Sequence, residues 1–482
     1  MAYKHGTYGE FAKSIGAVPV NSETTAVYVG TAPVNLIRGY AAAVNAPIKI
    51  SNLSEAQEKL GYSKDWESFT LCEAMEAHFN NALGNAGPVI FINVLNPVTH
   101  KNPQSKTETL TFVNGQAKIT SDKIIIDTLA LADKAEGTDY TVSYDFATGE
   151  VVISSTTITE AVQASYSEVD ASAVKEPDVI GKATSEGVYE GLGVIQLVYP
   201  ELGAITNIIA APKFSSSKAV YKAMINAATK INGHWDAFVN ADISITDTDT
   251  IAKAIEAKAA NEMVSERSKV YFPMWKTAGG DIYHLSTLAT KAMLEIDLEH
   301  DTVPMESCSN KQILSGKQYF GESSTNKGYD QQTANQLNAK GITTAVFWGG
   351  MNVLWGPHTA AYDYDALTDN RVIFDNSIRT MMHVTNSFQN EWGLEIDKPL
   401  TKALAETITN REQEKADALK AMGALIGEPV VEFNESDNTT DDMVQGNFTW
   451  SNKQTPTPPF KSGTLKVAYT TAGFDAEYGG DE

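Results

Sequence analysis

Two short serine motifs come closest to an enzymatic pattern in this sequence. Residues 215–218 read Ser-x-x-Lys and residues 436–438 read Ser-Asp-Asn. In penicillin-binding enzymes these motifs act with a Lys-Thr-Gly element to activate a serine, which here is Ser215. The third element is missing, because Lys276 and Thr277 are followed by alanine, and Ser-x-x-Lys also recurs at 324–327. The serines at 215–217 stand where a helix is expected to begin, so we interpret them as helix caps and predict no enzyme.

No other motif supplies a cofactor or metal site. The sequence contains no Gly-x-Ser-x-Gly, Walker or His-Glu-x-x-His motif, and Gly191 and Gly193 lack the third glycine of a dinucleotide fingerprint. The histidines are scattered: His78 is expected on the polar side of a helix, and His284 and His300 stand far apart in sequence. We therefore predict no catalytic residue, no cofactor-binding residue and no metal ligand.

The cysteines and the N-terminus indicate a chain without disulfides or export. Cys72 and Cys308 are the only cysteines in 482 residues, too few for a disulfide scaffold or a zinc ribbon. Cys72 falls on an apolar helical face and is expected in the core. The first ten residues lack the basic start and apolar run of a signal peptide, so the Asn-x-Thr patterns at Asn438 and Asn447 carry no weight.

The charge balance excludes several partners. Thirty-seven basic against sixty acidic residues give a net charge of −23, which repels phosphate backbones and anionic lipids. No apolar run approaches the length of a membrane span. We expect no nucleic-acid binding and no direct membrane insertion.

Strands and helices alternate in the first part of the chain. Residues 25–29 and 88–95 read as strands, the second buried on both faces. Between them we expect a helix from Ser54, with a capping box to Gln57, to Gly61, and a second helix over 68–83. This order predicts an α/β layer.

A β-rich segment interrupts this pattern. After a linker at 96–106, residues 107–170 contain the hairpin signal Asn114-Gly115 and alternating apolar residues. A second linker at 175–187 precedes further strands and helices at the ranges 205–210, 216–230, 236–239, 249–262 and 269–272. We therefore interpret the β-rich segment as an insertion in a discontinuous α/β domain.

The last third of the chain changes character. Residues around Gly349 and Gly350 read as a hairpin, 370–390 as a helix, and Asp397 as the cap of a long helix that ends before Gly423. That predicted helix concentrates basic side chains in an acidic chain, and we expect it to face another component of an assembly: Lys398, Lys402, Arg411, Lys415 and Lys420. The alternative is a solvated face on which Glu412 pairs with Lys415.

Both ends of the chain read as extended arms without a local partner. Residues 461–470 alternate at Leu465, Val467 and Tyr469, and the prolines at 456–459 prevent a local hairpin. Residues 1–20 are polar and glycine-containing. An unpaired strand is a hazard unless another chain's sheet accepts it. We expect these arms to add strands to neighbouring subunits, with the three alternating side chains setting the register.

Several motifs occur in a fixed order along the chain: TAVYVGTAP at 25–33, LN at 337–338, GI at 341–342, WGPHT at 355–359, NR at 370–371, DKPL at 397–400 and GAL at 423–425. Together they resemble the contractile tail sheath proteins of phages and of phage-tail-like bacteriocins. That family usually has Trp-Gly-Ala-Arg-Thr where this chain has Pro357 and His358, so no contact of the usual arginine is carried over.

The resemblance implies hexameric rings stacked helically around a tail tube, which contract to drive the tube through a bacterial envelope. It implies as partners other copies of the chain, the tail tube protein, and baseplate and tail terminator proteins. We expect the predicted basic helix to face the tube. It places the protein in a virion tail or phage-tail-like particle assembled in the host cytoplasm. A non-contractile adhesin or capsid module and a serine acyl-enzyme are the alternatives.

The expected fold is α/β and α+β with several domains. We predict an N-terminal arm (1–20), a discontinuous α/β core with a mixed sheet flanked by helices (21–97 and 188–345), an inserted antiparallel β domain resembling a sandwich or barrel (98–187), a C-terminal α+β sheath core domain (346–460) and a C-terminal arm (461–482).

Overall fold

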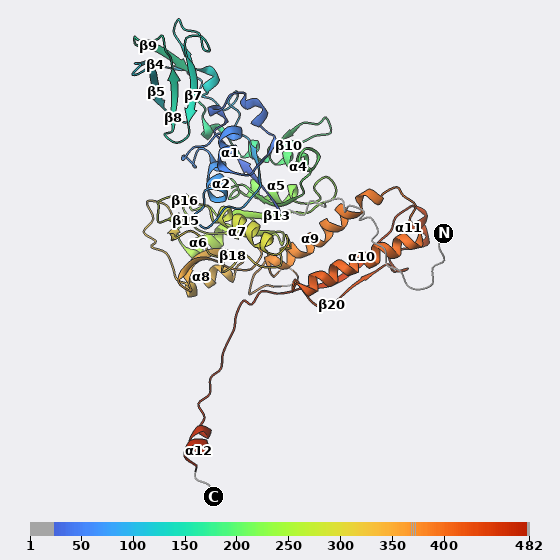
Figure 1. Ribbon diagram of the computed structural model, residues 1–482. Coiled ribbons are helices and arrows are strands. Elements are labelled where there is room, and N and C mark those ends of the chain that lie inside the picture. Colours follow the sequence, from blue (N-terminus) through green and yellow to red (C-terminus); the bar gives the residue numbers. More distant parts are fainter. Residues whose placement is uncertain (1–23, 368, 370, 372, 480–482) are drawn as a thin grey trace, which may run out of the picture.

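A large mixed sheet forms the centre of the computed structural model, which describes residues 24–367, 369, 371 and 373–479 (Figure 1). Its order is β19-β18-β14-β13-β12-β1-β3-β2. The antiparallel pairs lie at its two edges, β2–β3 and β18–β19, and all other neighbours are parallel. The strands are β1 (Thr25–Gly30), β2 (Pro47–Ile50), β3 (Val89–Asn93), β12 (Thr206–Ala210), β13 (Phe238–Asp242), β14 (Ser268–Tyr271), β18 (Ile342–Trp348) and β19 (Met351–Trp355). The predicted mixed α/β, multi-sheet architecture is confirmed, and the predicted arm at 1–20 lies outside the described residues.

Burial explains the continuous apolar runs in the sequence. Every residue of β1 and β3 is buried, as expected for parallel strands covered on both faces. The helices around the sheet are α1 (Leu53–Leu60), α2 (Thr70–Phe79), α4 (Ile195–Leu202), α5 (Lys218–Ala227), α6 (Ile251–Ala260), α7 (Leu285–Glu299) and α8 (Gln331–Asn338). Smaller elements are α3 (Glu176–Ile180), which lies in the predicted second linker, β10 (Lys182–Ala183), β11 (Tyr189–Glu190), β15 (Met274–Thr277), β16 (Ile282–Tyr283) and β17 (Gly316–Tyr319).

In the first part of the chain, the start of α1 and the end of α2 differ from the predictions. The cap of α1 is Asn52, whose side chain accepts the Glu55 N–H, so the predicted capping box at Ser54 is wrong. The Glu55 carboxylate in turn accepts the Ser51 N–H, which strengthens the cap at Asn52, two residues before the predicted one. Helix α2 stops at Phe79 because the Asn81 side chain accepts the Leu83 N–H in a local turn.

His78 is fully buried, which corrects its predicted place on a polar helix face. All ten residues of α2 are buried, so this helix has no solvent face. The imidazole lies 2.8 Å from the Tyr28 hydroxyl and 2.7 Å from the Ala86 carbonyl oxygen. Burial lowers the pKa of His78 to about 4. The residue therefore belongs to the core.

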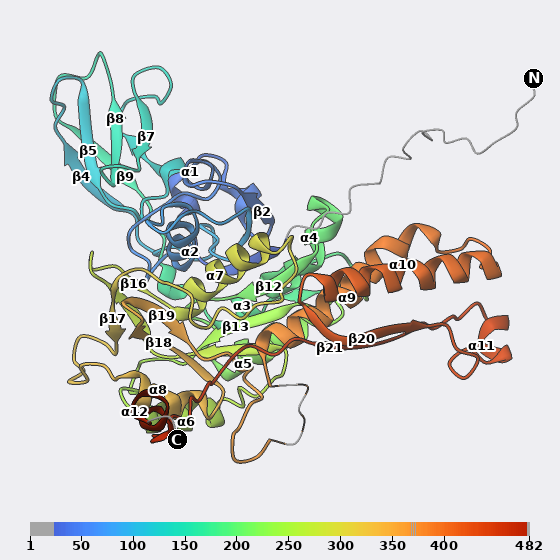
Figure 2. The same ribbon diagram turned by 60° about the horizontal axis from the view of Figure 1, so that its bottom comes forward.

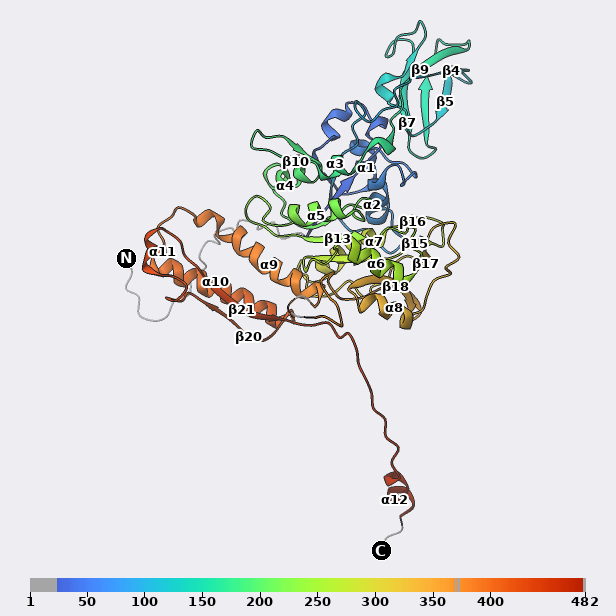
Figure 3. The ribbon, with the colours of Figure 1, turned by 180° about the vertical axis from the view of Figure 1, so that it is seen from behind.

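The β-rich segment folds into two three-stranded antiparallel sheets, β4-β9-β6 and β5-β8-β7. Their strands are β4 (Lys106–Leu110), β5 (Gln116–Thr120), β6 (Ala130–Leu131), β7 (Thr141–Asp145), β8 (Glu150–Ser154) and β9 (Val162–Tyr166). They enclose a separate apolar cluster that includes Ile124, Val151 and Ile153. Figures 1 and 3 show this segment at one end of the molecule, with Asn35 donating two hydrogen bonds that join it to the sheet region.

The C-terminal part projects from the opposite side of the molecule (Figure 2). Its elements are α9 (Asp375–Trp392), α10 (Lys402–Ala421), β20 (Leu425–Glu432), α11 (Thr440–Val444) and β21 (Ser451–Pro456). Thr401 caps α10, so the predicted cap at Asp397 is wrong: Asp397 has a φ of 66°, and Pro399 separates it from the helix. The sequence pattern did not predict the hairpin β20–β21.

Residues 461–470 form no strand, because no neighbouring strand takes up their backbone hydrogen bonds. They run away from the body to a short helix, α12 (Ala472–Tyr478), which the sequence did not predict (Figure 1). Of the helices in the described part of the chain, none has both the length and the apolar character to cross a membrane.

Candidate assembly interface

The C-terminal segment, residues 461–479, exposes apolar side chains that folded chains normally bury. Leu465, Val467 and Tyr469 are 87%, 84% and 83% exposed. Their spacing of two places them on one face of the segment whenever it is a strand. Contiguous exposed apolar side chains mark an interaction surface. The three predicted register residues therefore lie where another chain can reach them.

The hairpin β20–β21 offers one free edge. The Gln413 side chain of α10 donates to the Pro429 carbonyl oxygen (3.0 Å) and accepts the Val431 N–H (2.9 Å). Its amide thus bonds β20 as a neighbouring strand would. Among the described residues, β21 has sheet pairing with β20 alone. An incoming strand finds the outer side of β21 open and that of β20 occupied at this point.

The predicted basic helix does not present free cations. Arg411 and Lys415 of α10 both contact Glu391 of α9, at 3.2 Å and 2.8 Å. Lys415 also pairs with Glu412 at 2.6 Å, as the alternative interpretation expected. The remaining members pair with nearby carboxylates: Lys398 with Glu395, Lys402 with Glu406, and Lys420 with Glu428. Lys398 lies outside α10, so the five residues do not form one helical face.

A buried ion pair fixes the base of α9 to the central sheet. Lys269 of β14 and Asp375 at the start of α9 are both fully buried, with Nζ 2.7 Å from Oδ2. The same ammonium group donates to the Gly356 carbonyl oxygen at 2.6 Å, and the Ser307 hydroxyl donates to Asp375 at 3.0 Å. The carboxylate also suits the positive end of the helix dipole. A lysine within an apolar strand was the one sequence signal for this contact.

A second buried ion pair lies one turn along α9. Arg379 contacts the carboxylate of Asp297, near the end of α7. The Thr24 hydroxyl, immediately before β1, donates to the same carboxylate at 3.0 Å. Burial raises the pKa of Asp297, and the Arg379 guanidinium opposes that rise. This contact joins α7, α9 and the start of β1.

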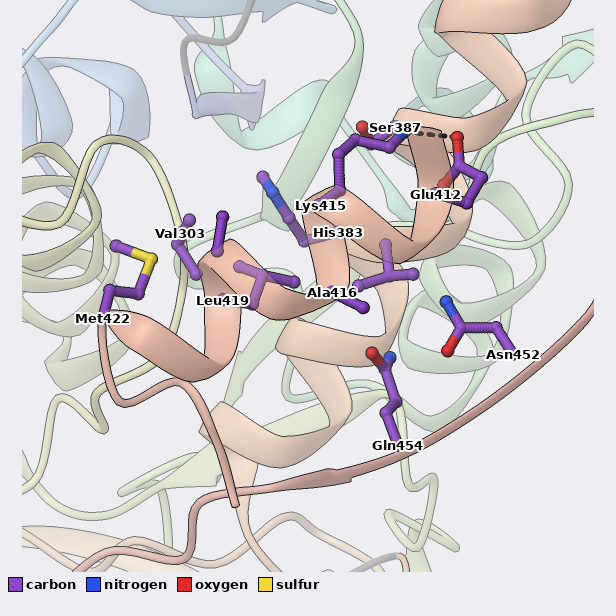
Figure 4. A pocket seen from close by; sticks show the side chains of 12 residues that line it. Val303, His383, Ser387, Glu412, Lys415, Ala416, Leu419, Met422, Asn452 and Gln454 are labelled. Carbon is purple, nitrogen blue, oxygen red and sulfur yellow. Dashed lines mark ion pairs between the residues drawn. The ribbon is translucent and has the colours of Figure 1, made fainter. Parts of the chain in front are cut away.

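A cavity of about 210 Å³ lies between α9, α10 and β21 (Figure 4). Aliphatic side chains, among them Val303, Ala416, Leu419 and Met422, share its lining with polar ones that include the paired Glu412 and Lys415. Gln454 of β21 also lines it, and its side-chain oxygen is shielded from solvent without a hydrogen-bond partner among the described residues. The cavity thus combines an apolar part with polar groups, of which the Gln454 oxygen has no hydrogen-bond partner.

The serine motifs do not form a nucleophilic site. Ser215 is fully buried, and its hydroxyl oxygen accepts the Asp242 N–H at 3.0 Å. Ser217 occupies the cap position of α5 without a side-chain cap bond, so capping by these serines is not what the structure shows. Asn438 instead closes its loop, donating to Asn434 and Thr449 carbonyl oxygens. Ser215 is therefore not placed to attack a substrate.

Histidines and cysteines are distributed as single residues. His284 bonds Glu73 at 2.7 Å. Burial opposes its charged form, but the carboxylates of Glu73 and Asp242 together outweigh burial and raise its pKa to about 9. His300 pairs with Glu306. Cys72 and Cys308 are both buried. No group of three metal-ligating side chains gathers within the described ranges.

His358, which stands where the resembling family has arginine, is an aromatic core residue. It stacks on Tyr362, with ring centroids 3.7 Å apart, and on Phe374 at 5.5 Å. Burial, with Lys461 and Lys269 nearby, lowers its pKa to about 3. His358 therefore contributes a neutral aromatic stack at this position.

Comparison with known proteins gives a match over nearly the whole chain. The tail sheath protein of Burkholderia phage BcepMu is 26% identical over 97% of both chains. The predicted resemblance to contractile tail sheath proteins is confirmed. The tail sheath protein of Escherichia phage P2 is 24% identical, over 61% of this chain and 70% of its own. No family model matches the chain.

The fold of this chain recurs in solved structures. A sheath chain from an extracellular contractile injection system, the PVC sheath complex in its contracted state, superposes with a TM-score of 0.57. The alignment covers 98% of this chain and 99% of the other at 11% identity. Similarity at this level describes the fold alone.

Proposed function

We propose that this chain is the structural subunit of a contractile tail sheath. It polymerises as stacked hexameric rings around a tail tube and contracts to drive the tube through a bacterial envelope. The observation that carries this proposal is the full-length similarity to a phage tail sheath protein. The exposed C-terminal segment and the free edge of β21 support it, because they are complementary features of one chain.

Subunits are linked by strand addition. The segment around Leu465, Val467 and Tyr469 pairs with the outer edge of β21 in a neighbouring subunit, satisfying backbone groups on both chains. The N-terminal arm, residues 1–20, contributes a second link. Extended tethers let rings rotate and slide past one another without separating, which contraction requires.

The other partners are the tail tube protein and the baseplate and tail terminator proteins. The particle is a virion tail or a phage-tail-like injection device, assembled in the cytoplasm of the host bacterium. The more exposed basic side chains of α10, Lys402, Arg411 and Lys420, with Lys398 before it, face the tube, whereas Lys415 lies toward α9 and supports this face through its pair with Glu391. Exposed ion pairs contribute only about 0–1 kcal/mol each, so such contacts release readily when the sheath contracts.

The inserted β domain, residues 98–187, lies on the outer surface of the sheath. The separate apolar core formed within residues 110–166, and the position of this part at the end of the molecule away from α9 and α10, support this placement (Figure 3). A chain lacking 98–187 should still assemble. Complete loss of polymers from that folded variant would contradict the outer placement.

Electron microscopy of the concentrated protein tests the proposed function. A sheath subunit should form hollow ribbed cylinders of constant diameter, even without its tube. A non-contractile adhesin or capsid module would give no such cylinders, and their absence over a wide range of concentration and salt would contradict the proposal. Labelling of Ser215 by a fluorophosphonate probe would instead support the acyl-enzyme alternative.

A further inference from the structure

Helix α12 has features of a docking element rather than of a self-supporting helix. It has only seven residues, whereas isolated helices shorter than about 12–15 residues are marginal in water. Phe474 and Tyr478 lie one turn apart, with ring centroids 6.5 Å apart, and are 57% and 79% exposed. Such an aromatic face requires a surface to cover it.

The cavity between α9, α10 and β21 has the complementary chemistry. The aliphatic part of its lining, around Leu419 and Met422, suits an aromatic ring, and the unsatisfied side-chain oxygen of Gln454 calls for a hydrogen-bond donor (Figure 4). A tyrosine supplies both, because its ring is apolar and its hydroxyl donates. The cavity also lies between two helices, where a third helix packs naturally.

Charge and reach favour α12 as the occupant. Residues 472–482 contain four acidic residues and no basic one, while α10 balances four basic with four acidic residues in a chain of net charge −23. An acidic segment meets less repulsion there than on the average surface. If 461–470 pairs with β21, α12 follows within two residues of the paired strand, beside the strand that carries Gln454.

We propose that α12 of one subunit docks in the cavity between α9, α10 and β21 of a second copy, with Tyr478 entering it and donating its hydroxyl hydrogen to Gln454. This inference rests on the proposed sheath function and adds a second contact between the two subunits that the strand pairing links. The strand sets the register, and the helix at its end resists withdrawal.

Disulfide trapping in assembled cylinders tests the docking. Copies carrying Gln454→Cys are mixed with copies carrying Tyr478→Cys, assembled and mildly oxidised. The native Cys72 and Cys308 are buried and stay in place. We expect a covalent dimer between the two kinds of copy, and none when Tyr478→Cys is replaced by Tyr364→Cys, an exposed tyrosine outside the segment.

Different results would contradict the docking of α12 and the proposed sheath function. If cylinders form but Gln454→Cys cross-links to Val467→Cys and not to Tyr478→Cys, the strand fills the cavity and the docking is wrong. A disulfide within a double-variant single chain would also overturn it. If the unaltered chain forms no cylinders, the proposed function and the docking both fall.

Assembly strength gives a second readout. Tyr478→Ala should raise the protein concentration needed for assembly about tenfold, because one buried aromatic side chain is lost. The concentration needed by Tyr478→Phe should lie between those of the unaltered chain and of Tyr478→Ala, since this variant loses only the hydroxyl group. An unchanged assembly concentration for Tyr478→Ala would overturn the docking.

Discussion

The base of α9 and the C-terminal segment distribute polarity in opposite ways. At the base of α9, Lys269 and Asp375 place full charges in the interior, each held by several partners. In the C-terminal segment, Leu465 and Val467 place apolar side chains in solvent. The first arrangement is complete within one chain and fixes geometry. The second is complete only when another chain covers the exposed side chains. The molecule therefore contains one contact that holds α9 in place and one surface that awaits a partner chain.

Removing the buried charge should have the largest effect on stability. Lys269→Met leaves the Asp375 carboxylate buried without its cation, and we expect a loss of about 3–5 kcal/mol in the free energy of unfolding. Denaturant titration followed by circular dichroism measures it. Lys253→Met, which breaks an exposed pair with Asp249, is the matched control and should change stability by less than about 1 kcal/mol. Equal effects of both variants would show that the joint is not special.

Acid should act on the same region through His358. Its folded-state pKa of about 3 lies below the ordinary value of 6.5, so the unfolded state binds a proton first. Stability is therefore intact above pH 6.5 and falls as the pH drops toward 3. At pH 5 this costs about 2 kcal/mol, at 1.36 kcal/mol per pH unit. His358→Phe keeps the aromatic stack and should lose about 2 kcal/mol less between pH 7 and 5, measured by urea midpoints; an identical pH dependence would contradict this.

Breaking the contact between α9 and α10 should have a smaller effect. Arg411→Glu with Lys415→Glu turns two attractions to Glu391 into repulsions and should cost about 1 kcal/mol, because the groups are partly solvated. Adding Glu391→Lys should restore the loss. In the assembled sheath the double variant should also bind the tail tube protein less while staying soluble. Unchanged extended tails would defeat the tube-facing proposal.

The sequence pattern predicted those strands and turns that depend mainly on residues close together in the chain. The apolar run around Ile90 gave β3 at nearly its observed bounds, and the glycines at 349 and 350 gave the turn of the β18–β19 hairpin. The β20–β21 hairpin was missed because Gly427 and Pro429 interrupt its alternation at a register shift. The pairing of Lys269 with Asp375 joins residues far apart in sequence, which no periodicity reveals.

The candidate interface was predicted only in part, because its proposed acceptor depends on a contact between residues far from the C-terminal segment in sequence. The alternation at Leu465, Val467 and Tyr469 identified the segment, but its proposed acceptor depends on Gln413 covering one edge of the hairpin. That contact is tertiary. Helix α12 was missed because residues 472–478 are short and glycine-containing, with too little periodicity to indicate a helix.

Truncation after Pro459 tests the central claim most directly, namely that the C-terminal segment completes its interface only in another subunit. We expect the truncated chain to keep the unfolding midpoint of the full chain, because residues 461–479 pack little against the body. We also expect it to stay monomeric where the full chain forms cylinders, as seen by sedimentation and electron microscopy. Cylinders of normal length from the truncated chain would contradict the account.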